Sequence, residues 1–281
     1  IFSAVIVWAT VRLALRPDLG GAIAGLWHAG VPVLRSAVPG ALERVRLAAS
    51  YPLVPYSTRL GQGRFSWAGR PHLLRLNYEP HSIHGVGFAR SWTVTEYGPD
   101  RAVLKLEHAA DEDWPFAFEA EQQIVLDPQG LELKMNATNR ADGPAPMGLG
   151  WHPYFPLRPR SRLHAELEGR WDFDDVKLPR QHVAQHGIDS DVSHLDFDHC
   201  FTGWQGQARL RDEKFSLVLS SSLRHLVVYT PKEQDYFAVE PVSHVNNALN
   251  MPEPEAHGVR VLQPGETTSA WMKLQVLEAR V

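Results

Sequence analysis

The sequence predicts an all-β protein built as a single large antiparallel β-sandwich. Three observations predict it: apolar and polar residues alternate with a period of two at many places, turn-forming residues are spread along the whole chain, and helical periodicity is scarce. The chain has 281 residues, of which 21 are Gly and 21 are Pro, and these are not concentrated in a linker. Large sandwiches reach this length as one domain, so residues 1–281 are expected to form one domain.

The N-terminal fifty residues are expected to contain a strand and the best helical segment. Residues 1–11 are mostly apolar, but no basic region precedes them, and Arg12 and Arg16 interrupt the run before the ~20 residues that a membrane-spanning helix needs. We therefore expect neither a signal peptide nor a membrane anchor. Alternation over 11–16 predicts a strand, and 17–21 a turn. Residues 38–50 are the best helical segment.

Further along the chain, the same alternation predicts more strands. An Asp-Pro-Gln-Gly sequence at 127–130 is typical of a hairpin turn and joins two alternating segments. The strands expected in this part of the chain are 122–126, 131–136, 215–220 and 272–276.

Composition and charge exclude several classes of partner. The chain has 28 basic and 32 acidic residues, a net charge of −4, so no overall positive field attracts nucleic acid or anionic membranes. Its single Cys excludes an internal disulfide framework and a multi-thiolate metal site. We expect a cytoplasmic protein, although a periplasmic protein without disulfides would have the same composition. A monomer or a homodimer is expected.

Common catalytic and nucleotide-binding motifs are missing. The sequence has no phosphate-binding P-loop, no dinucleotide-binding Gly-x-Gly-x-x-Gly, no Gly-x-Ser-x-Gly nucleophile elbow and no His-Glu-x-x-His zinc motif. The single Cys200 has no catalytic signature around it and is expected to be a small buried residue.

Two segments carry candidate acid–base residues. His152 lies among glycines and aromatic residues in 148–155, where it could be held firmly and partly desolvated, as suits a proton donor near neutral pH. Glu240 follows an apolar strand and precedes a proline, an unusual place for a carboxylate unless it has a purpose, such as a general base. The alternatives are a core His at a strand end and a Glu in a salt bridge.

Three more segments carry candidate binding residues. Residues 81–92 contain His81 and His84 among glycines, and residues 51–60 end near Arg59. In residues 194–201, three polar side chains would share one face if the segment formed a strand: His194, Asp196 and Asp198. A metal site in the first two segments is possible, but the spacing says little without a helix. Asp198 could accept from hydroxyl groups, and Arg59 could donate to hydroxyls or an anion.

Taken in order, these five segments resemble the aldose 1-epimerase (galactose mutarotase) family. The resemblance runs from about residue 11 to residue 276 and includes the Leu-Gln-Pro-Gly-Glu sequence at 262–266. It implies one large β-sandwich domain, described as a supersandwich, and an enzyme that interconverts the α and β anomers of a free aldose. It also implies that neither a metal nor an organic cofactor is used.

The resemblance further implies roles for individual residues. Glu240 matches the catalytic base that takes the proton from the anomeric hydroxyl, and His152 matches the acid that protonates the ring oxygen. Substrate-binding positions are matched by His84, Arg59 and Asp198. By their chemistry more than by motif, Trp151 and Trp92 are expected to be sugar-stacking faces.

The identity of the sugar is less constrained. Galactose-specific members usually have Asn where this chain has Thr58 and where it has Trp151, which weakens an assignment to galactose. The stretch 84–90 also resembles the branch that acts on hexose 6-phosphates, in which Arg59 and Arg90 could hold the phosphate. Because these are the only two candidate cations in the five segments, and Lys is absent from them, neutral aldoses are expected to be preferred.

Two alternatives remain open from the sequence. The first is an epimerase for a hexose 6-phosphate or another anionic sugar, and the second is a carbohydrate-binding sandwich without activity. A binding protein needs no acid–base pair, so the presence of both Glu240 and His152 favours the enzyme. If these two side chains lay on opposite sides of a pocket, the enzyme would be favoured further. If Glu240 formed a salt bridge in the core instead, the binding protein would be favoured. A glycoside hydrolase is not indicated, because no paired carboxylates are evident.

Overall fold

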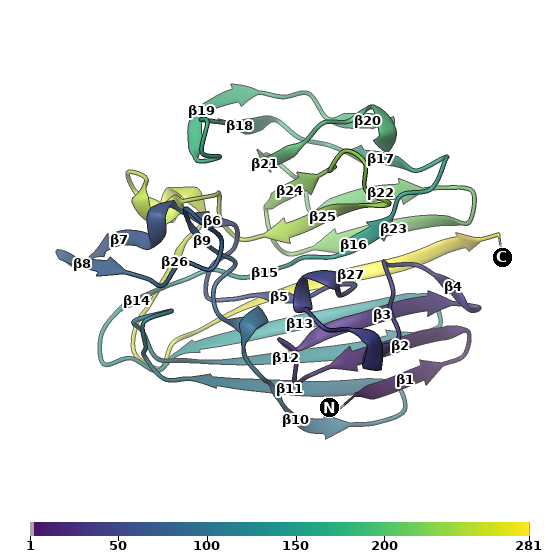
Figure 1. The fold of residues 1–281 in the computed structure, drawn as a ribbon, viewed down its shortest axis with the longest axis horizontal. Coiled ribbons are helices and arrows are strands. Elements are labelled where there is room, and N and C mark those ends of the chain that lie inside the picture. Colours follow the sequence, from purple (N-terminus) through teal and green to yellow (C-terminus); the bar gives the residue numbers. More distant parts are fainter. Residues whose placement is uncertain (1–2, 281) are drawn as a thin grey trace.

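Antiparallel strands make up most of the molecule in the computed structural model, which describes residues 3–280. The predicted all-β, antiparallel sandwich is confirmed (Figure 1). In the described residues the largest sheet has nine strands. In spatial order they are β10 (Thr93–Tyr97), β11 (Arg101–His108), β12 (Phe118–Asp127), β13 (Gly130–Asn139), β27 (Thr267–Ala279), β23 (Phe215–Ser221), β22 (Gln207–Arg211), β17 (Arg162–Ala165) and β20 (Ile188–Asp191).

The second large sheet, of eight strands within residues 3–280, carries much of the candidate site. Its strands in spatial order are β19 (Pro179–Ala184), β18 (Gly169–Phe173), β21 (Asp198–Thr202), β24 (His225–Tyr229), β25 (Tyr236–Val242), β15 (Gly150–Trp151) and β5 (Pro52–Leu53), with β16 (Tyr154–Pro156) also paired to β25.

Smaller elements complete the described part of the chain. The N-terminal sheet is formed by β1 (Ala4–Trp8), β2 (Val11–Arg16), β3 (Ala22–His28) and β4 (Val31–Pro32). The two-stranded pairs are β14 (Ala145–Met147) with β26 (Arg260–Leu262), β6 (Arg59–Leu60) with β9 (Ser82–Ile83), and β7 (Arg64–Trp67) with β8 (Arg70–Leu73). The short 3-10 helices are η1 (Pro39–Ala41), η2 (Val45–Leu47), η3 (Gly61–Gly63), η4 (Gly87–Ala89), η5 (Val192–His194), η6 (Ala248–Asn250) and η7 (Pro254–His257).

Most of the predicted strands are found. The strand expected over 11–16 is β2, and the expected hairpin joins β12 to β13 across Asp127–Gly130. The alternating segments at 215–220 and 272–276 lie in β23 and β27. Residues 1–2 and 281 of the expected domain lie outside the described residues. None of the helices in the described part of the chain has the length and apolar character to span a membrane.

The helix expected over 38–50 is wrong. Only two 3-10 turns form there, separated by extended backbone at Leu42 and Arg44. Arginine side chains take up carbonyl groups that an α-helix would pair internally: Arg35 Nη2 donates to the carbonyls of Arg46 and Ala48 at 2.6 and 2.8 Å. Arg16 Nη1 similarly donates to the carbonyls of Pro39 and Leu42. This clamped segment places its own arginines near the eight-stranded sheet.

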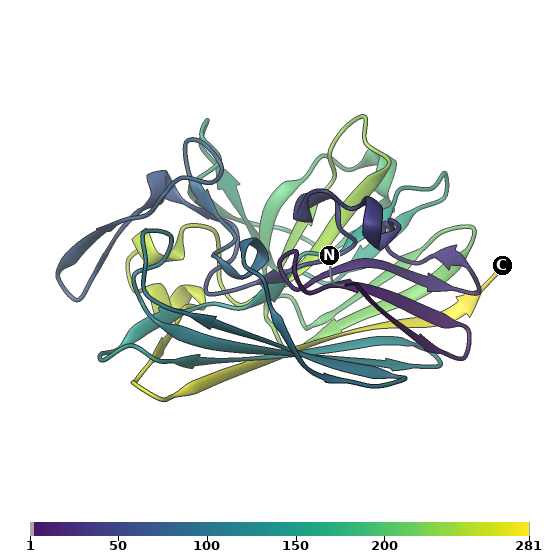
Figure 2. The ribbon, with the colours of Figure 1, turned by 60° about the horizontal axis from the view of Figure 1, so that its bottom comes forward.

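The core lies between the sheets. Figure 2 shows the long strands of the nine-stranded sheet as one layer, with the N-terminal strands and the green strands of the second sheet on one side of it. Gln122 on β12 bridges the layers, because its amide oxygen accepts from the indole N–H of Trp151 on β15 at 2.9 Å. Its amide nitrogen donates to the carbonyl of Gly21. A buried polar residue is tolerated here because both ends of its amide are paired.

Candidate active site

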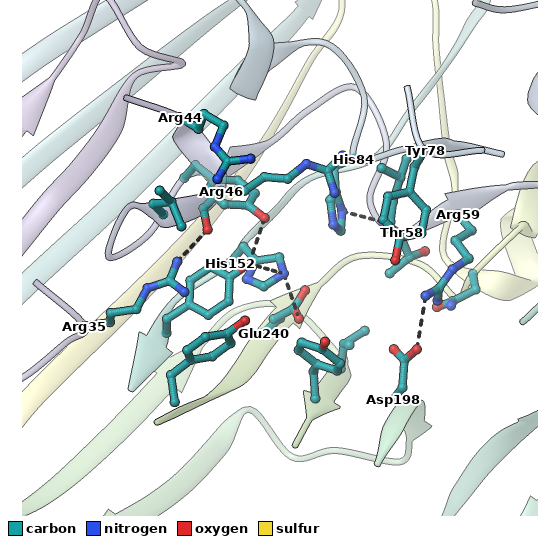
Figure 3. Close-up of a pocket in the computed structure, with 18 residues that line it drawn as sticks. Arg35, Arg44, Arg46, Thr58, Arg59, Tyr78, His84, His152, Asp198 and Glu240 are labelled. Carbon is teal, nitrogen blue, oxygen red and sulfur yellow. Dashed lines mark hydrogen bonds and ion pairs between the residues drawn. The ribbon is translucent and has the colours of Figure 1, made fainter. Parts of the chain in front are cut away.

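A cavity of about 350 Å³ lies against the eight-stranded sheet, large enough for a small ligand. Its walls come from three parts of the chain that are distant in sequence: the segment with η1 and η2, the loops around β5, β6 and β9, and the strands of the sheet (Figure 3). The lining residues that carry polar or charged groups are Arg35, Arg44, Arg46, Tyr51, Thr58, Arg59, Tyr78, His84, His152, Tyr154, Asp198, Tyr229, Tyr236, Glu240 and Asn246.

Strand register brings the sheet residues together. In an antiparallel pair, directly opposed residues project from the same face of the sheet. Val227 on β24 is opposite Glu240 on β25, and Asp198 on β21 is opposite Tyr229 on β24. All four residues line the cavity. The register therefore places the carboxyl groups of Glu240 and Asp198 on one face, although 42 positions separate them in the sequence.

Glu240 and His152 form a buried contact at the cavity. The Nε2 atom of His152 lies 3.2 Å from Oε1 of Glu240, and both side chains are buried. Oε2 of Glu240 and Nδ1 of His152 have no hydrogen-bond partner in residues 3–280. Buried polar atoms are nearly always paired in proteins, so these two unpaired atoms single out the pair as a candidate for a functional role.

Burial opposes the charged form of both members of this pair. It raises the pKa of Glu240 well above its ordinary value, with a further contribution from the negative charge of Asp198. Burial, followed by the positive charge of Arg35, lowers the pKa of His152 to about 3. Above about pH 3 and below the raised pKa of Glu240, the two groups therefore share one proton, and the pair titrates as a unit.

Two tyrosines hold the imidazole of His152. The ring stacks on that of Tyr154 with centroids 4.3 Å apart and lies 4.9 Å from that of Tyr51. The Tyr154 hydroxyl is 3.4 Å from Nε2 of His152 and 3.2 Å from the Tyr51 hydroxyl. Burial raises the pKa of Tyr154 to about 12 and raises that of Tyr51 well above its ordinary value, so both remain hydroxyls at neutral pH.

His84 has a defined tautomer. The backbone N–H of Thr58 donates to its Nδ1 atom at 3.2 Å, so the ring proton is on Nε2. Burial, followed by the charge of His152, lowers the pKa of His84 well below its ordinary value, which keeps the ring neutral. Thr58 and His84 have φ of +58° and +66°, which non-glycine residues rarely adopt and which are enriched at active sites. The neutral ring can offer Nε2–H to a ligand oxygen.

Arg59 and Asp198, predicted separately from two motifs, form an ion pair. Arg59 Nη2 lies 3.1 Å from Asp198 Oδ2, and both line the cavity. Their side chains are largely shielded from solvent, with 11% and 26% exposed. Each group retains hydrogen-bonding capacity, because a guanidinium has five donors and a carboxylate about four acceptor sites. A sugar hydroxyl could therefore donate to Asp198 while accepting from Arg59.

The two tryptophans expected to stack on sugar do not line the cavity. Trp151 is fully buried, and its indole N–H donates to Gln122 between the sheets. The physical reason is strand alternation: successive residues point to opposite faces, and the next residue, His152, faces the cavity. Trp92 is also buried, with its indole N–H donating to the carbonyl of Gly87 at 2.8 Å.

Arg90 does not line the cavity either. Its guanidinium lies 2.6 Å from a carboxylate oxygen of Asp113 and 2.8 Å from one of Asp111. Arg90 follows the 3-10 turn η4 in extended backbone, and its side chain pairs with these two carboxylates. Sequence reasoning placed Arg90 at the site because of its neighbours in the motif, but its charge is compensated elsewhere.

The sequence also missed several residues that line the cavity. Arg44 and Arg46 come from the segment 38–50 that was expected to be helical, and Arg35 lies just before it; all three lay outside every motif. Their close spacing, with Glu43 as the single acid among residues 35–46, was the signal available. Tyr51 and Tyr154 stand in two of the motifs but were not identified as site residues.

The possible metal ligands do not converge. Within residues 3–280, no group of three or more His, Cys, Asp or Glu side chains is placed to hold a metal ion. His194 ends the turn η5, and Asp196 is exposed beside Lys232. The expectation that these two residues share a strand face with Asp198 is wrong, because β21 begins only at Asp198.

The arrangement suits proton exchange with two neighbouring oxygen atoms. A carboxyl group and an imidazole in contact can take a proton from one oxygen and give one to the other. Comparison with known proteins agrees with this chemistry. A family model described as aldose 1-epimerase matches residues 10–275. The uncharacterized protein YphB of Escherichia coli K12 is 31% identical over 285 residues, covering 92% of this chain and 93% of that protein.

Solved structures have the same fold. A crystal structure from Escherichia coli K12, provisionally assigned as an aldose 1-epimerase, has a TM-score of 0.87 at 27% identity and covers 99% of this chain and 100% of that chain. A galactose mutarotase-like protein from Clostridium acetobutylicum, at 18% identity, has a TM-score of 0.85 with 99% of each chain covered, which shows the fold alone. With the match over residues 10–275, these similarities show that the chain belongs to the aldose 1-epimerase family.

Proposed function

We propose that Glu240 and His152 are the catalytic residues with which this aldose 1-epimerase opens and recloses a pyranose ring. Membership of the family makes the protein an isomerase that acts on sugars. The observation that carries the assignment of roles is the 3.2 Å contact between the buried His152 Nε2 and Glu240 Oε1 atoms in the cavity. Each residue also has one buried polar atom without a hydrogen-bond partner in residues 3–280.

In the proposed reaction, protons move while the C1–O5 bond breaks and reforms. Glu240 takes the proton from the O1 hydroxyl, the O1 electrons form the aldehyde carbonyl, and the C1–O5 bond breaks as His152 protonates O5. Rotation about the C1–C2 bond presents the other face of the carbonyl. Reclosure returns both protons and gives the other anomer, so each group acts as acid in one direction and as base in the other.

The direct contact of the two groups fits this chemistry. Side chains on opposite sides of a pocket were expected to favour an enzyme, whereas Glu240 and His152 are adjacent. O1 and O5 are both bonded to C1, so two adjacent groups can reach these two adjacent oxygens. Glu240 is paired with a residue that itself lines the cavity, not with a core cation, which is why the structure supports catalysis over a binding protein without activity.

Three further residues are proposed to position the sugar. His84 would donate Nε2–H to a ring or hydroxyl oxygen, and the Arg59–Asp198 pair would donate to one hydroxyl and accept from another. Fixing the ring in this way holds C1 against the catalytic pair, which lowers the entropic part of the barrier. The cytoplasmic location and the monomeric or dimeric state expected from the sequence stay predictions.

Polarimetry tests the proposed function directly. Freshly dissolved α-anomers of glucose, galactose and anionic aldoses are mixed with the protein, and the rate without protein is subtracted. We expect saturable acceleration of mutarotation for at least one sugar. Saturable binding of sugars without any acceleration would instead support the carbohydrate-binding alternative.

A further inference from the structure

The cavity is more basic than the molecule that contains it. The whole chain has a net charge of −4, yet Arg35, Arg44, Arg46 and Arg59 all line the cavity. Two acidic residues line the cavity, and each of them already has a partner there. Asp198 is paired with Arg59, and Glu240 shares its proton with His152. Three positive charges are therefore left without a negative partner at the site.

Ion pairing distinguishes these three arginines from others in the chain. Arg16, Arg90, Arg158 and Arg162 each contact at least one Asp carboxylate within 3.2 Å. In the described part of the chain, no carboxylate forms an ion pair with Arg35, Arg44 or Arg46, whose only acidic neighbour in the segment is the exposed Glu43. A cluster of like charges is unfavourable by itself, so its position beside a cavity indicates an anionic ligand.

The three arginines differ in the number of free donors. Arg35 is fixed, because it donates to the backbone carbonyls of Ala48 and Arg46 and stacks on Tyr154 with its guanidinium carbon 3.8 Å from the ring centroid. It adds charge but few free donors. Among residues 3–280, the side chain of Arg46 donates only one hydrogen bond, a long one of 3.4 Å to the carbonyl of Asn77. No hydrogen bond of the Arg44 side chain to another described residue is found.

Arg44 and Arg46 lie on a different wall of the cavity from Glu240 of the catalytic pair. They flank or lie in the turn η2, which forms the wall facing the strands of the sheet, whereas Glu240 projects from β25 (Figure 3). Arg46 also lies with its guanidinium carbon 5.1 Å from the ring centroid of Tyr78. An anion held by these two side chains would belong to the part of the ligand away from the reacting carbon.

We propose that Arg44 and Arg46, with the added charge of Arg35, bind an anionic group on the sugar substrate, a phosphate or a carboxylate remote from C1. The guanidinium fork matches both groups, and two neighbouring forks can hold one anion through several charge-assisted hydrogen bonds. The proposal rests on the proposed function, since it names the substrate class of the same cavity. It replaces the preference for neutral aldoses that the sequence suggested, because that preference counted Arg90 and missed these three arginines.

The test compares anionic and neutral sugars in one buffer. We measure kcat/KM for mutarotation of glucose, glucose 6-phosphate and glucuronate, with the rates without enzyme subtracted. The preferred anionic sugar is expected to exceed glucose by about ten-fold or more, as hydrogen bonds to a charged group would give. Glucose 6-phosphate and glucuronate distinguish a phosphate site from a carboxylate site. Equal values for all three sugars, or a preference for glucose, would overturn the proposal.

Variants assign the effect to these residues. In an Arg44→Ala/Arg46→Ala double variant, the ratio of kcat/KM for the anionic sugar to that for glucose is expected to fall by about ten-fold or more. Arg70→Ala is the matched control, because Arg70 lies at the start of β8 and does not line the cavity. An unchanged ratio in the double variant, or an equal fall in the control, would contradict the assignment.

A binding measurement separates failure of this proposal from failure of the proposed function. The compound 1,5-anhydroglucitol has no anomeric hydroxyl and cannot mutarotate, and its 6-phosphate carries the anion. Calorimetry on the wild-type protein is expected to show tighter binding of the 6-phosphate, with the difference lost in the double variant. If no sugar mutarotates but this difference is found, the catalytic roles fail and the anion site stands. If the two compounds bind equally while glucose mutarotates, the anion site fails alone.

Discussion

The Nε2 atom of His152 lies 3.2 Å from Oε1 of Glu240, and both side chains are buried at the cavity. A contact this short allows one proton to move between the carboxyl and the imidazole. The pair is ready for ring opening when it holds exactly one proton in total, since a second proton removes the base and loss of the last one removes the acid.

The pH dependence of mutarotation is expected to show a broad plateau. Burial lowers the pKa of His152 to about 3 and raises that of Glu240 well above its ordinary value of 4.5, so the one-proton state begins above about pH 3 and extends up to the raised pKa of Glu240. We expect no inflection from His152 at the ordinary His value of 6.5, and a fall in kcat/KM as the pH passes the raised pKa of Glu240 and the last proton leaves. An inflection near 6.5 that disappears in His152→Asn would contradict this account.

Asp198→Asn is expected to weaken sugar binding more than it slows the chemical step. The amide oxygen can still accept from Arg59, but the charge that strengthens hydrogen bonds with sugar hydroxyls is lost. We expect KM to rise by about ten-fold, with a smaller change in kcat. Asp196→Asn is the control, because Asp196 is exposed and pairs with Lys232. A fall in kcat without a change in KM would move Asp198 into the catalytic step.

Trp151→Phe is expected to destabilise the protein and leave catalysis nearly unchanged. The substitution removes the indole N–H that satisfies Gln122 between the two sheets. Leaving that buried acceptor unpaired costs about 1–3 kcal/mol in the free energy of unfolding, measured by urea denaturation. A large rise in KM with unchanged stability would return Trp151 to the sugar-binding site.

Glu240→Gln is expected to make the stability of the protein less sensitive to alkaline pH. The pKa of Glu240 is raised in the folded state, so its protonated form contributes stability that is full below 4.5 and is lost as pH rises towards the folded-state value. Gln does not titrate. Thermal unfolding at about pH 5 and about pH 8 should show the advantage of the variant growing with pH. A constant difference in Tm between the two proteins would show that Glu240 is already ionised.

The sequence predicted the strands better than the segments between them. Alternation reports which face of a strand is buried, and β2, the β12–β13 hairpin and β23 follow it. In the segment 38–50, no comparable pattern in the sequence indicates the two 3-10 turns that form there. Its turns depend on hydrogen bonds from Arg16 and Arg35, which are distant from the carbonyls they hold, so local sequence could not reveal them.

The residues of the candidate site were likewise predicted only in part. His152, Glu240, His84, Arg59 and Asp198 were found because each stands in a recognisable motif, and all five line the cavity. Trp151 and Trp92 were predicted from the chemistry of their rings, and Arg90 from its neighbours in a motif, and neither signal shows which way a side chain points. Which side chain faces the cavity depends on strand alternation and on partners elsewhere in the fold, such as Gln122 and Asp113.

The activity of Glu240→Gln tests the account most directly. The amide has nearly the same shape as the carboxyl group but cannot take the proton from O1. With the sugar that the wild type turns over fastest, and with folding checked by circular dichroism, we expect kcat for mutarotation to fall by about 10²-fold or more, the usual contribution of a general base. A folded Glu240→Gln variant that retains kcat within a few-fold of the wild type would show that Glu240 is not the base.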